Sequence, residues 1–249
     1  IPVVTCEVGE STGDFTKSDP LRVWPVLDPK LRMLRYYPFR KAAYGLDRYL
    51  IYKGWISVDS ALRAAEAACG TPYWFVAQTF GNAVSDREPE PYWRTPNAAE
   101  LKAQLHLALA RGARGLLFYT YQCERSWDGM VDQATLAPLP NRLLDAASEM
   151  ARLANKHGRI LNALRFGGWV EAVPEQDYVL AVPRYLGKDD RNGEKYLYLL
   201  NLKTDREAKG DMAFSVKVKP FPAIESVYSG QRIPTTLKAG RLVVPYRIE

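Results

Sequence analysis

Aromatic, amide and arginine side chains gather at the ends of four short apolar segments of this sequence. Aromatic rings stack on the C–H faces of sugars, and amide or guanidinium groups hydrogen-bond to neighbouring hydroxyls. The repetition of these residue types at successive segment ends predicts a carbohydrate-binding surface. The candidate substrate-binding residues are Tyr37, Arg40, Gln78, Trp93, Arg94, Tyr119, Tyr121, Gln122 and Trp127.

The candidate catalytic groups are two glutamates, Glu7 near the end of the first apolar segment and Glu124 after the fourth. Solvated or ion-paired surface glutamates are the alternative interpretation of both. The two histidines, His106 and His157, fall within helix-like patterns, so no hydrolytic triad is expected at a segment end. The cysteines lack the spacing of metal ligands and no glycine-rich phosphate loop occurs, so we expect no metal and no cofactor.

The composition argues against two classes of partner. The net charge of +6 comes from 34 basic and 28 acidic residues. The basic residues are scattered along the chain, which indicates a solvated surface rather than a nucleic-acid partner. No run approaches the roughly 18 apolar residues of a membrane helix, so no membrane span is expected.

Apolar runs alternate with helix-like patterns in the first two thirds of the chain. Runs that are apolar on both faces suit parallel strands covered by helices. Thr95 and Pro96 are the expected cap and first residue of the second helix. The pattern predicts an α/β fold, the second half of a (β/α)8 barrel over residues 1–169, with its site at the strand ends. The expected strands are 2–8, 31–37, 73–80 and 115–121, and the expected helices are 57–70, 95–111 and 141–157.

Period-two alternation replaces this pattern near residue 178. It predicts a small antiparallel β-sandwich domain over residues 170–249 that acts as a structural cap, with carbohydrate binding as the alternative. The expected strands are 178–182, 196–201, 212–218, 224–228 and 241–248, and the expected turns are 191–193, 209–211, 229–230 and 239–240.

Several segments resemble glycoside hydrolases of the β-galactosidase-like (β/α)8-barrel superfamily. In those bacterial proteins a barrel is followed by a small β-sandwich. The resemblance implies that the four strands are the fifth to eighth of the barrel, and that a missing N-terminal half comes from the same gene or from a second chain. It also implies a secreted or periplasmic protein. The segments are YYPFR at 36–40, TPYWFVAQTFG at 71–81, WRTPNAAELKAQLHLALARGARGLLFYTYQ at 93–122, and the later YLYLLNLK and VYSGQ.

The resemblance implies a glycoside hydrolase acting on an oligo- or polysaccharide, with one departure from the family pattern. Retaining members end strands four and seven with carboxylates about 5–5.5 Å apart. Gln78 ends the strand that resembles the seventh, and an amide has no anionic oxygen to form a glycosyl ester. Some relatives use the substrate's acetamido group instead, and Gln78 would then position the substrate. The driving acid would lie in the missing half.

Two alternatives to the hydrolase follow from the same residues. A catalytically silent carbohydrate-binding barrel would explain why Gln78 stands where a nucleophile is expected. A structural subunit that pairs its open half-barrel with another polypeptide is the third possibility, because four strands leave two unpaired edges.

Overall fold

The computed structural model describes residues 3–8, 41–47, 49–50, 54–68, 73–82, 94–122, 127–167, 171–188, 193–215 and 223–248. Contacts divide the chain into two compact units, residues 1–152 and 153–249, and the division falls inside helix α5. The domain boundary expected from the sequence, between residues 169 and 170, lies beyond β7. No helix among the described residues is both long enough and apolar enough to cross a membrane.

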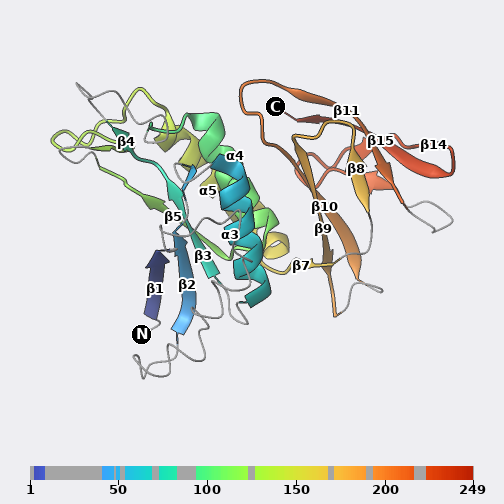
Figure 1. Cartoon of the computed structure of the whole chain (residues 1–249), viewed down its shortest axis with the longest axis horizontal. Helices are drawn as coiled ribbons and strands as arrows, with labels where there is room; N and C mark the ends of the chain where they lie inside the picture. The colour runs from blue at the N-terminus through green and yellow to red at the C-terminus, as the bar shows by residue number, and fades with distance from the viewer. Residues whose placement is uncertain are drawn as a thin grey trace. The chain divides into compact units, whose positions relative to one another are not determined.

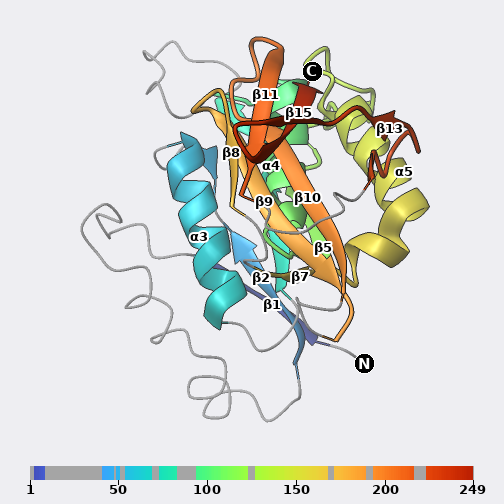
Figure 2. The ribbon, with the colours of Figure 1, turned by 90° about the vertical axis from the view of Figure 1, so that its right-hand side faces the viewer.

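A four-stranded parallel sheet in the order β1-β2-β3-β5 forms the centre of the first unit. Figures 1 and 2 show α3 and α4 on the same face of this sheet. A short antiparallel pair, β4 with β6, follows the ends of β3 and β5. The elements are β1 (Val3–Val8), β2 (Lys41–Asp47), α3 (Gly54–Ala68), β3 (Tyr73–Gln78), β4 (Gly81–Asn82), α4 (Ala98–Ala110), β5 (Gly115–Tyr119), β6 (Trp127–Asp128) and α5 (Leu143–Leu161).

Helix α4 packs on β3 through the apolar stripe that its sequence predicts. Leu101, Leu105 and Ala108 recur at helical spacing and are fully buried. The Tyr73 hydroxyl at the start of β3 donates to the Arg111 carbonyl at the end of α4, at 2.7 Å. The Arg111 guanidinium in turn donates to both carboxylate oxygens of Asp59 on α3, at 2.6 and 3.0 Å. This buried pairing fixes the two helices relative to each other.

The helix start differs from the sequence prediction. Asn97, not Thr95, is the N-cap of α4, and it forms a capping box in which the side chains of Asn97 and Glu100 satisfy each other's backbone N–H groups. The Thr95 hydroxyl is used elsewhere, because it donates to an Asp128 carboxylate oxygen at 3.3 Å. Pro96 therefore precedes the cap instead of occupying the first helical position.

The second strand of the sheet was not predicted. The structure places β2 at Lys41–Asp47, between β1 and β3, whereas the expected strand at 31–37 lies outside the described residues. The segment KAAYGLD has small residues and a glycine instead of a β-branched run, so its local strand signal is weak. Backbone pairing on both sides makes it a strand.

Two larger antiparallel sheets, in the orders β10-β9-β7 and β14-β15-β11-β8, and a separate β12–β13 pair make up the described part of the second unit. Both sheets contribute to one apolar core, in which Val179 of β9 packs with Met212 and Phe214 of β11 and Val244 of β15. The elements are β7 (Arg165–Phe166), β8 (Ala172–Pro174), β9 (Val179–Leu186), β10 (Glu194–Asn201), β11 (Ala208–Phe214), β12 (Ile224–Glu225), β13 (Arg232–Ile233), β14 (Thr236–Lys238) and β15 (Arg241–Ile248).

The turn predicted at residues 209–211 is wrong, because β11 runs through this position. Gly210 has a packing reason: a Cβ here would meet a Glu175 carboxylate oxygen at 2.7 Å and the Gln176 amide at 2.9 Å. Both side chains hydrogen-bond to the β11 backbone, to the N–H of Asp211 and to the carbonyl of Lys209. The glycine makes room for side chains that hydrogen-bond to the β11 backbone.

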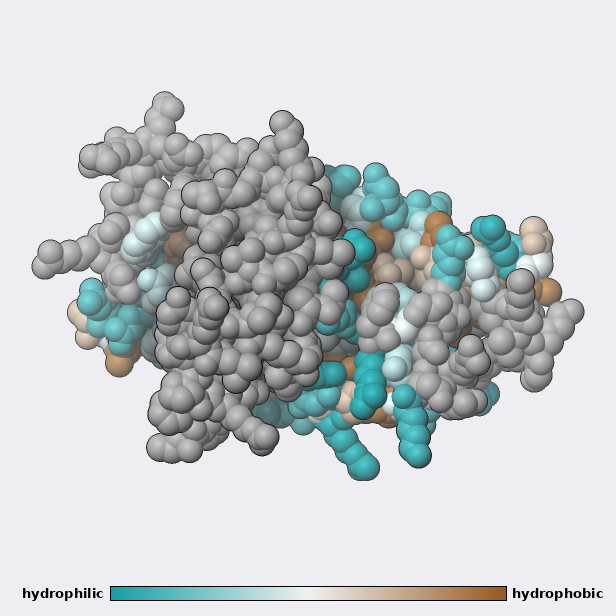
Figure 3. Space-filling view, turned by 60° about the horizontal axis from the view of Figure 1, so that its bottom comes forward, coloured by the Kyte–Doolittle hydropathy of each residue, from teal (hydrophilic) through white to brown (hydrophobic). Residues whose placement is uncertain are grey.

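On the face shown in Figure 3, hydrophilic and hydrophobic residues are interspersed. Single exposed apolar residues of this kind are normal on a folded protein.

Candidate functional site

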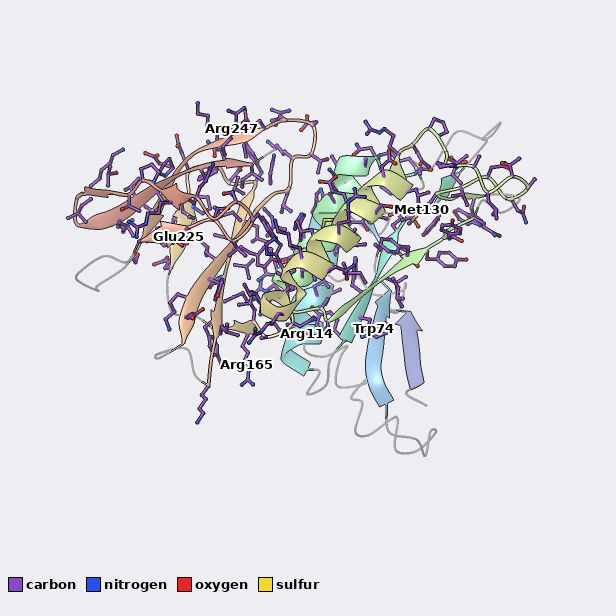
Figure 4. All side chains as sticks on the ribbon, turned by 180° about the vertical axis from the view of Figure 1, so that it is seen from behind. Trp74, Arg114, Met130, Arg165, Glu225 and Arg247 are labelled. Carbon is purple, nitrogen blue, oxygen red and sulfur yellow. The ribbon has the colours of Figure 1, made fainter. Side chains whose placement is uncertain are left out.

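The candidate site lies where the parallel strands end, an edge that we call the C-terminal edge. Register pairs Gln78 of β3 with Tyr119 of β5, at the last residues of both strands. Figure 4 shows Trp74 and Arg114 at the opposite end of these strands, while Met130 belongs to the loop beyond the C-terminal edge. In parallel α/β sheets, ligands bind at this edge because the loops that follow the strands converge there.

Four rings form an aromatic cluster at the C-terminal edge: Tyr49, Phe80, Tyr119 and Trp127. Phe80 is central, with ring centroids 4.9 Å from Tyr49, 5.5 Å from Tyr119 and 5.0 Å from Trp127, all edge-on. Phe80 and Tyr49 are buried, whereas Tyr119 is 47% exposed. The cluster is thus anchored in the core and presents one tyrosine to solvent.

The side chain of Gln78 is fully enclosed beneath this cluster, with 1% of its surface exposed. Its amide nitrogen donates to the carbonyls of Phe80 and Arg94, at 3.1 and 3.2 Å. Its backbone N–H donates to the Gln104 side-chain oxygen on α4, at 3.1 Å. The side-chain oxygen of Gln78 has no hydrogen-bond partner within the described structure. Gln78 therefore links the segments at Phe80 and Arg94 to the sheet, and its side-chain oxygen remains an unused acceptor.

A close approach of two backbones holds the loop that precedes α4. At Gly81, a Cβ would lie 2.0 Å from the Thr95 nitrogen and 2.5 Å from the Arg94 carbonyl carbon, so only glycine fits. Gly81 also pairs with Asp128 in the β4–β6 ribbon. Together with the Thr95–Asp128 hydrogen bond, these contacts join the segments that follow β3 and β5 at one point.

The main partner of the Arg94 guanidinium is the Glu100 carboxylate, and a longer hydrogen bond of 3.4 Å runs to the Thr95 carbonyl. The guanidinium donates to one carboxylate oxygen at 2.7 Å and also contacts the other. Burial tends to raise the pKa of Glu100, but hydrogen bonds from Arg94 and from the Asn97 backbone outweigh it and lower the pKa below its usual value. The hydrogen bond to Glu100 raises the pKa of Arg94. The positive charge at this edge is therefore neutralised from within the protein.

Hydrogen bonds hold the described part of the loop after β5. The Tyr121 carbonyl accepts from the N–H groups of Met130 and Val131, at 2.9 and 3.1 Å. The Asp132 carboxylate accepts from the backbone N–H and the hydroxyl of Thr135, both at 2.8 Å, and these bonds lower the pKa of Asp132. This loop holds Tyr121 with 49% of its surface exposed, close in sequence to the exposed Tyr119.

The structure describes six of the nine predicted substrate-binding residues. Gln78, Tyr119 and Trp127 come together at the aromatic cluster, and Arg94 reaches it through its carbonyl. Gln122 is exposed and bridges to Val131. The predicted residues that lie outside the described residues are Tyr37, Arg40, Trp93 and Glu124.

The second catalytic candidate, Glu7, lies in β1 and pairs with Leu46 of β2, which in turn pairs with Phe75. Gln78 and Tyr119, the last residues of β3 and β5, pair with each other. Glu7 is therefore not in register with the pair at the C-terminal edge. Within the described ranges, no three His, Cys, Asp or Glu residues come together as a metal site.

Sequence reasoning missed two members of the site, Tyr49 and Asp128. Tyr49 follows β2, a strand that the sequence does not reveal, so its position at a strand end had no signal. Asp128 was detectable in principle, because it directly follows Trp127, a predicted substrate-binding residue.

The comparisons with known proteins include a distant likeness to a solved structure. No family model matches the sequence, and no curated protein matches it. Among solved structures, the chain is similar to an alpha-fucosidase of Thermotoga maritima in complex with a mechanism-based inhibitor, with a TM-score of 0.36 and 8% identity. The match covers 91% of this chain and 52% of that one, so the chain spans about half the length of that structure. Both backbone agreement and identity are low.

Proposed function

We propose that this chain supplies a sugar-binding wall of a glycoside hydrolase-like barrel, with β1, β2, β3 and β5 as part of a (β/α)8 sheet. Tyr119 is the observation that carries the proposal. Its ring belongs to the aromatic cluster, 5.5 Å from Phe80, and yet 47% of the residue is exposed. A ring that packs against Phe80 and is also exposed to solvent suits stacking on the apolar face of a sugar, because little side-chain entropy is lost on binding.

Polar groups around the cluster supply the second requirement of a sugar site. Hydroxyls of a sugar need acceptors and donors at fixed positions. Tyr121, held by its hydrogen-bonded loop, and the carboxylate of Asp128, the residue after Trp127, offer such groups at the same edge. Oligo- and polysaccharides are the proposed ligands, bound along the C-terminal edge.

The proposal covers binding by this chain and leaves the chemistry to a carboxylate elsewhere. Gln78 cannot form a glycosyl ester, and both hydrogens of its amide are used on main-chain carbonyls. The same observation supports the second candidate function, a catalytically silent carbohydrate-binding protein. Assaying the complete protein with aryl glycosides separates the two, because any turnover that requires a carboxylate excludes the silent protein.

Replacing Tyr119 tests the binding wall directly. Tyr119→Ala removes the stacking ring and is expected to weaken oligosaccharide binding about tenfold, as for the loss of roughly 1.5 kcal/mol of aromatic contact. Tyr119→Phe keeps the ring and should bind within about threefold of the wild type. Isothermal titration against neutral oligosaccharides gives the affinities.

Tyr228→Ala is the matched control, since Tyr228 is 41% exposed and belongs to the second unit. It should leave the affinity unchanged. The proposal fails if the wild type binds no sugar, or if Tyr119→Ala and Tyr228→Ala have the same effect.

A further inference from the structure

We propose that Asp128 is the carboxylate that accepts hydrogen bonds from ligand hydroxyls, and that the ligand at this edge is a neutral sugar rather than an acidic one. This inference rests on the proposed function and names both a recognition residue and a substrate class. Asp128 directly follows Trp127, a member of the aromatic cluster, and pairs with Gly81, which directly follows Phe80. This pairing places the backbone of Asp128 next to the two residues that carry stacking rings, Phe80 and Trp127.

The Asp128 carboxylate has acceptor capacity to spare. An ionised carboxylate offers about four lone-pair sites. Within the described part of the chain, one hydrogen bond reaches it, from the Thr95 hydroxyl at 3.3 Å. That distance is long for a bond between two oxygens, where about 2.7 Å is usual. Asp128 is half-buried, and a carboxylate removed from water in this way is stabilised by further donors.

A second unused acceptor lies nearby. The side-chain oxygen of Gln78 is buried and has no partner among the described residues, while the nitrogen of the same amide donates to the Phe80 carbonyl. The orientation of the amide is fixed, because two carbonyls face its nitrogen. Gln78 and Asp128 therefore each leave acceptor capacity unused among the described residues.

The charges of the edge favour a neutral ligand. Arg94 would be the obvious partner for an anionic sugar, but Glu100 already engages its guanidinium with both carboxylate oxygens. A uronic acid would bring its carboxylate toward Asp128 with no uncommitted arginine among the described residues here to offset the repulsion. Hydroxyl groups, which donate, complement Asp128 and carry no charge cost.

A purely structural role for Asp128 is the competing explanation, since its bond to Thr95 ties two loops together. Three variants of the full chain separate the explanations. Asp128→Asn keeps the shape and one acceptor oxygen but loses the charge. Thr95→Val removes the tie and leaves the carboxylate. Asp145→Asn is the matched control, because Asp145 is an exposed carboxylate of the first turn of α5, paired with Arg142.

The probes are xylo-, manno-, cello- and galacto-oligosaccharides, with oligogalacturonate as the acidic counterpart, titrated at constant ionic strength. We expect the wild type to bind at least one neutral probe and to bind it more tightly than the uronate. Asp128→Asn should weaken that binding at least tenfold, since a hydrogen bond to a charged group is lost. Thr95→Val should change it less than about threefold, and Asp145→Asn not at all. Melting temperatures show that each variant is folded.

Two results would overturn the inference while leaving the proposed function in place. One is equal weakening by Thr95→Val and Asp128→Asn, which would make Asp128 a structural tie. The other is tighter binding of the uronate than of every neutral probe. Absence of binding to all probes would instead overturn the proposed function, and this inference with it.

Discussion

The two units of the chain use buried polar groups in different ways. At the C-terminal edge of the parallel sheet, Gln78, Gln104 and Glu100 are buried. Gln78 and Glu100 hydrogen-bond to a loop and to a helix start, and Gln104 hydrogen-bonds to the β3 backbone at Gln78. In the second unit Arg184 and Asn201 are also buried, and Asn201 hydrogen-bonds to the turn after β10, while Met212 and Phe214 lie in an apolar core between the two larger sheets. Buried polar networks fix unique geometry, whereas apolar cores supply stability. The difference is that three buried polar side chains gather at one edge of the first unit's sheet, where the candidate site lies.

Glycine shows the same contrast. In the first unit, Gly81 lies against the backbone of Thr95. In the second unit, Gly210 lies against the side chains of Glu175 and Gln176. A backbone cannot move aside without disturbing its element, but the ends of flexible side chains can. The same substitution at the two positions is therefore a direct test of how rigid each unit is.

Gly81→Ala should have the largest effect. The new Cβ would be placed 2.0 Å from the Thr95 nitrogen, so the loop before α4 must move. We expect a loss of about 4 kcal/mol in the free energy of unfolding, at the high end for a single substitution. Urea unfolding followed by tryptophan fluorescence measures it, because five of the six tryptophans precede residue 153. A loss below about 1 kcal/mol would mean that this approach is not tight.

Acid should weaken the first unit next most strongly, through His106 on α4. Burial lowers the pKa of His106 to about 4, against a slight opposing effect of Glu149 and a reinforcing one of Lys102. The unfolded chain, with an ordinary histidine pKa near 6.5, binds the proton first. The contribution of neutral His106 to the free energy of unfolding is therefore fully present above about pH 6.5. It is lost as the pH drops toward 4, by at most about 3 kcal/mol.

The His106→Gln variant should lose this part of the pH dependence. Stability measured from pH 4 to 7 in wild type and variant gives the difference. The chain has two histidines, so the imidazole NMR signal that is lost in the variant belongs to His106 and the one that remains belongs to His157. A His106 signal that titrates near pH 6.5 in the folded protein would contradict the burial argument.

Gly210→Ala should have the smallest effect, below about 1 kcal/mol. The Glu175 and Gln176 side chains can rotate away from the new methyl group, although they give up hydrogen bonds to Asp211 and Lys209. Differential scanning calorimetry of both glycine variants compares them in one experiment. If Gly210→Ala is as damaging as Gly81→Ala, the contrast between the two units is wrong.

Much of the fold follows from local patterns in the sequence. The apolar runs at β3 and β5 and the stripe of α4 stand where they were predicted, because each element carries its own apolar pattern. The β-rich second unit was likewise expected from period-two alternation. That the parallel sheet is half of a (β/α)8 barrel stays a prediction.

Other features depend on partners distant in sequence. The strand β2 has little local signal and is defined by its two neighbours. The Thr95 hydroxyl, the predicted cap of α4, instead donates to Asp128, which is distant in sequence. No pattern within a few residues of Gly210 reveals the side chains that lie over it.

The sequence by itself determined which residue types stand at the strand ends: tyrosines, a tryptophan, an arginine and a glutamine. Tertiary structure decided what each does, because partners are chosen by spatial proximity. It left Tyr119 open to solvent, assigned Arg94 to Glu100, and turned Gln78 toward two main-chain carbonyls. It also brought Asp128, from the loop after β5, beside rings that follow other strands.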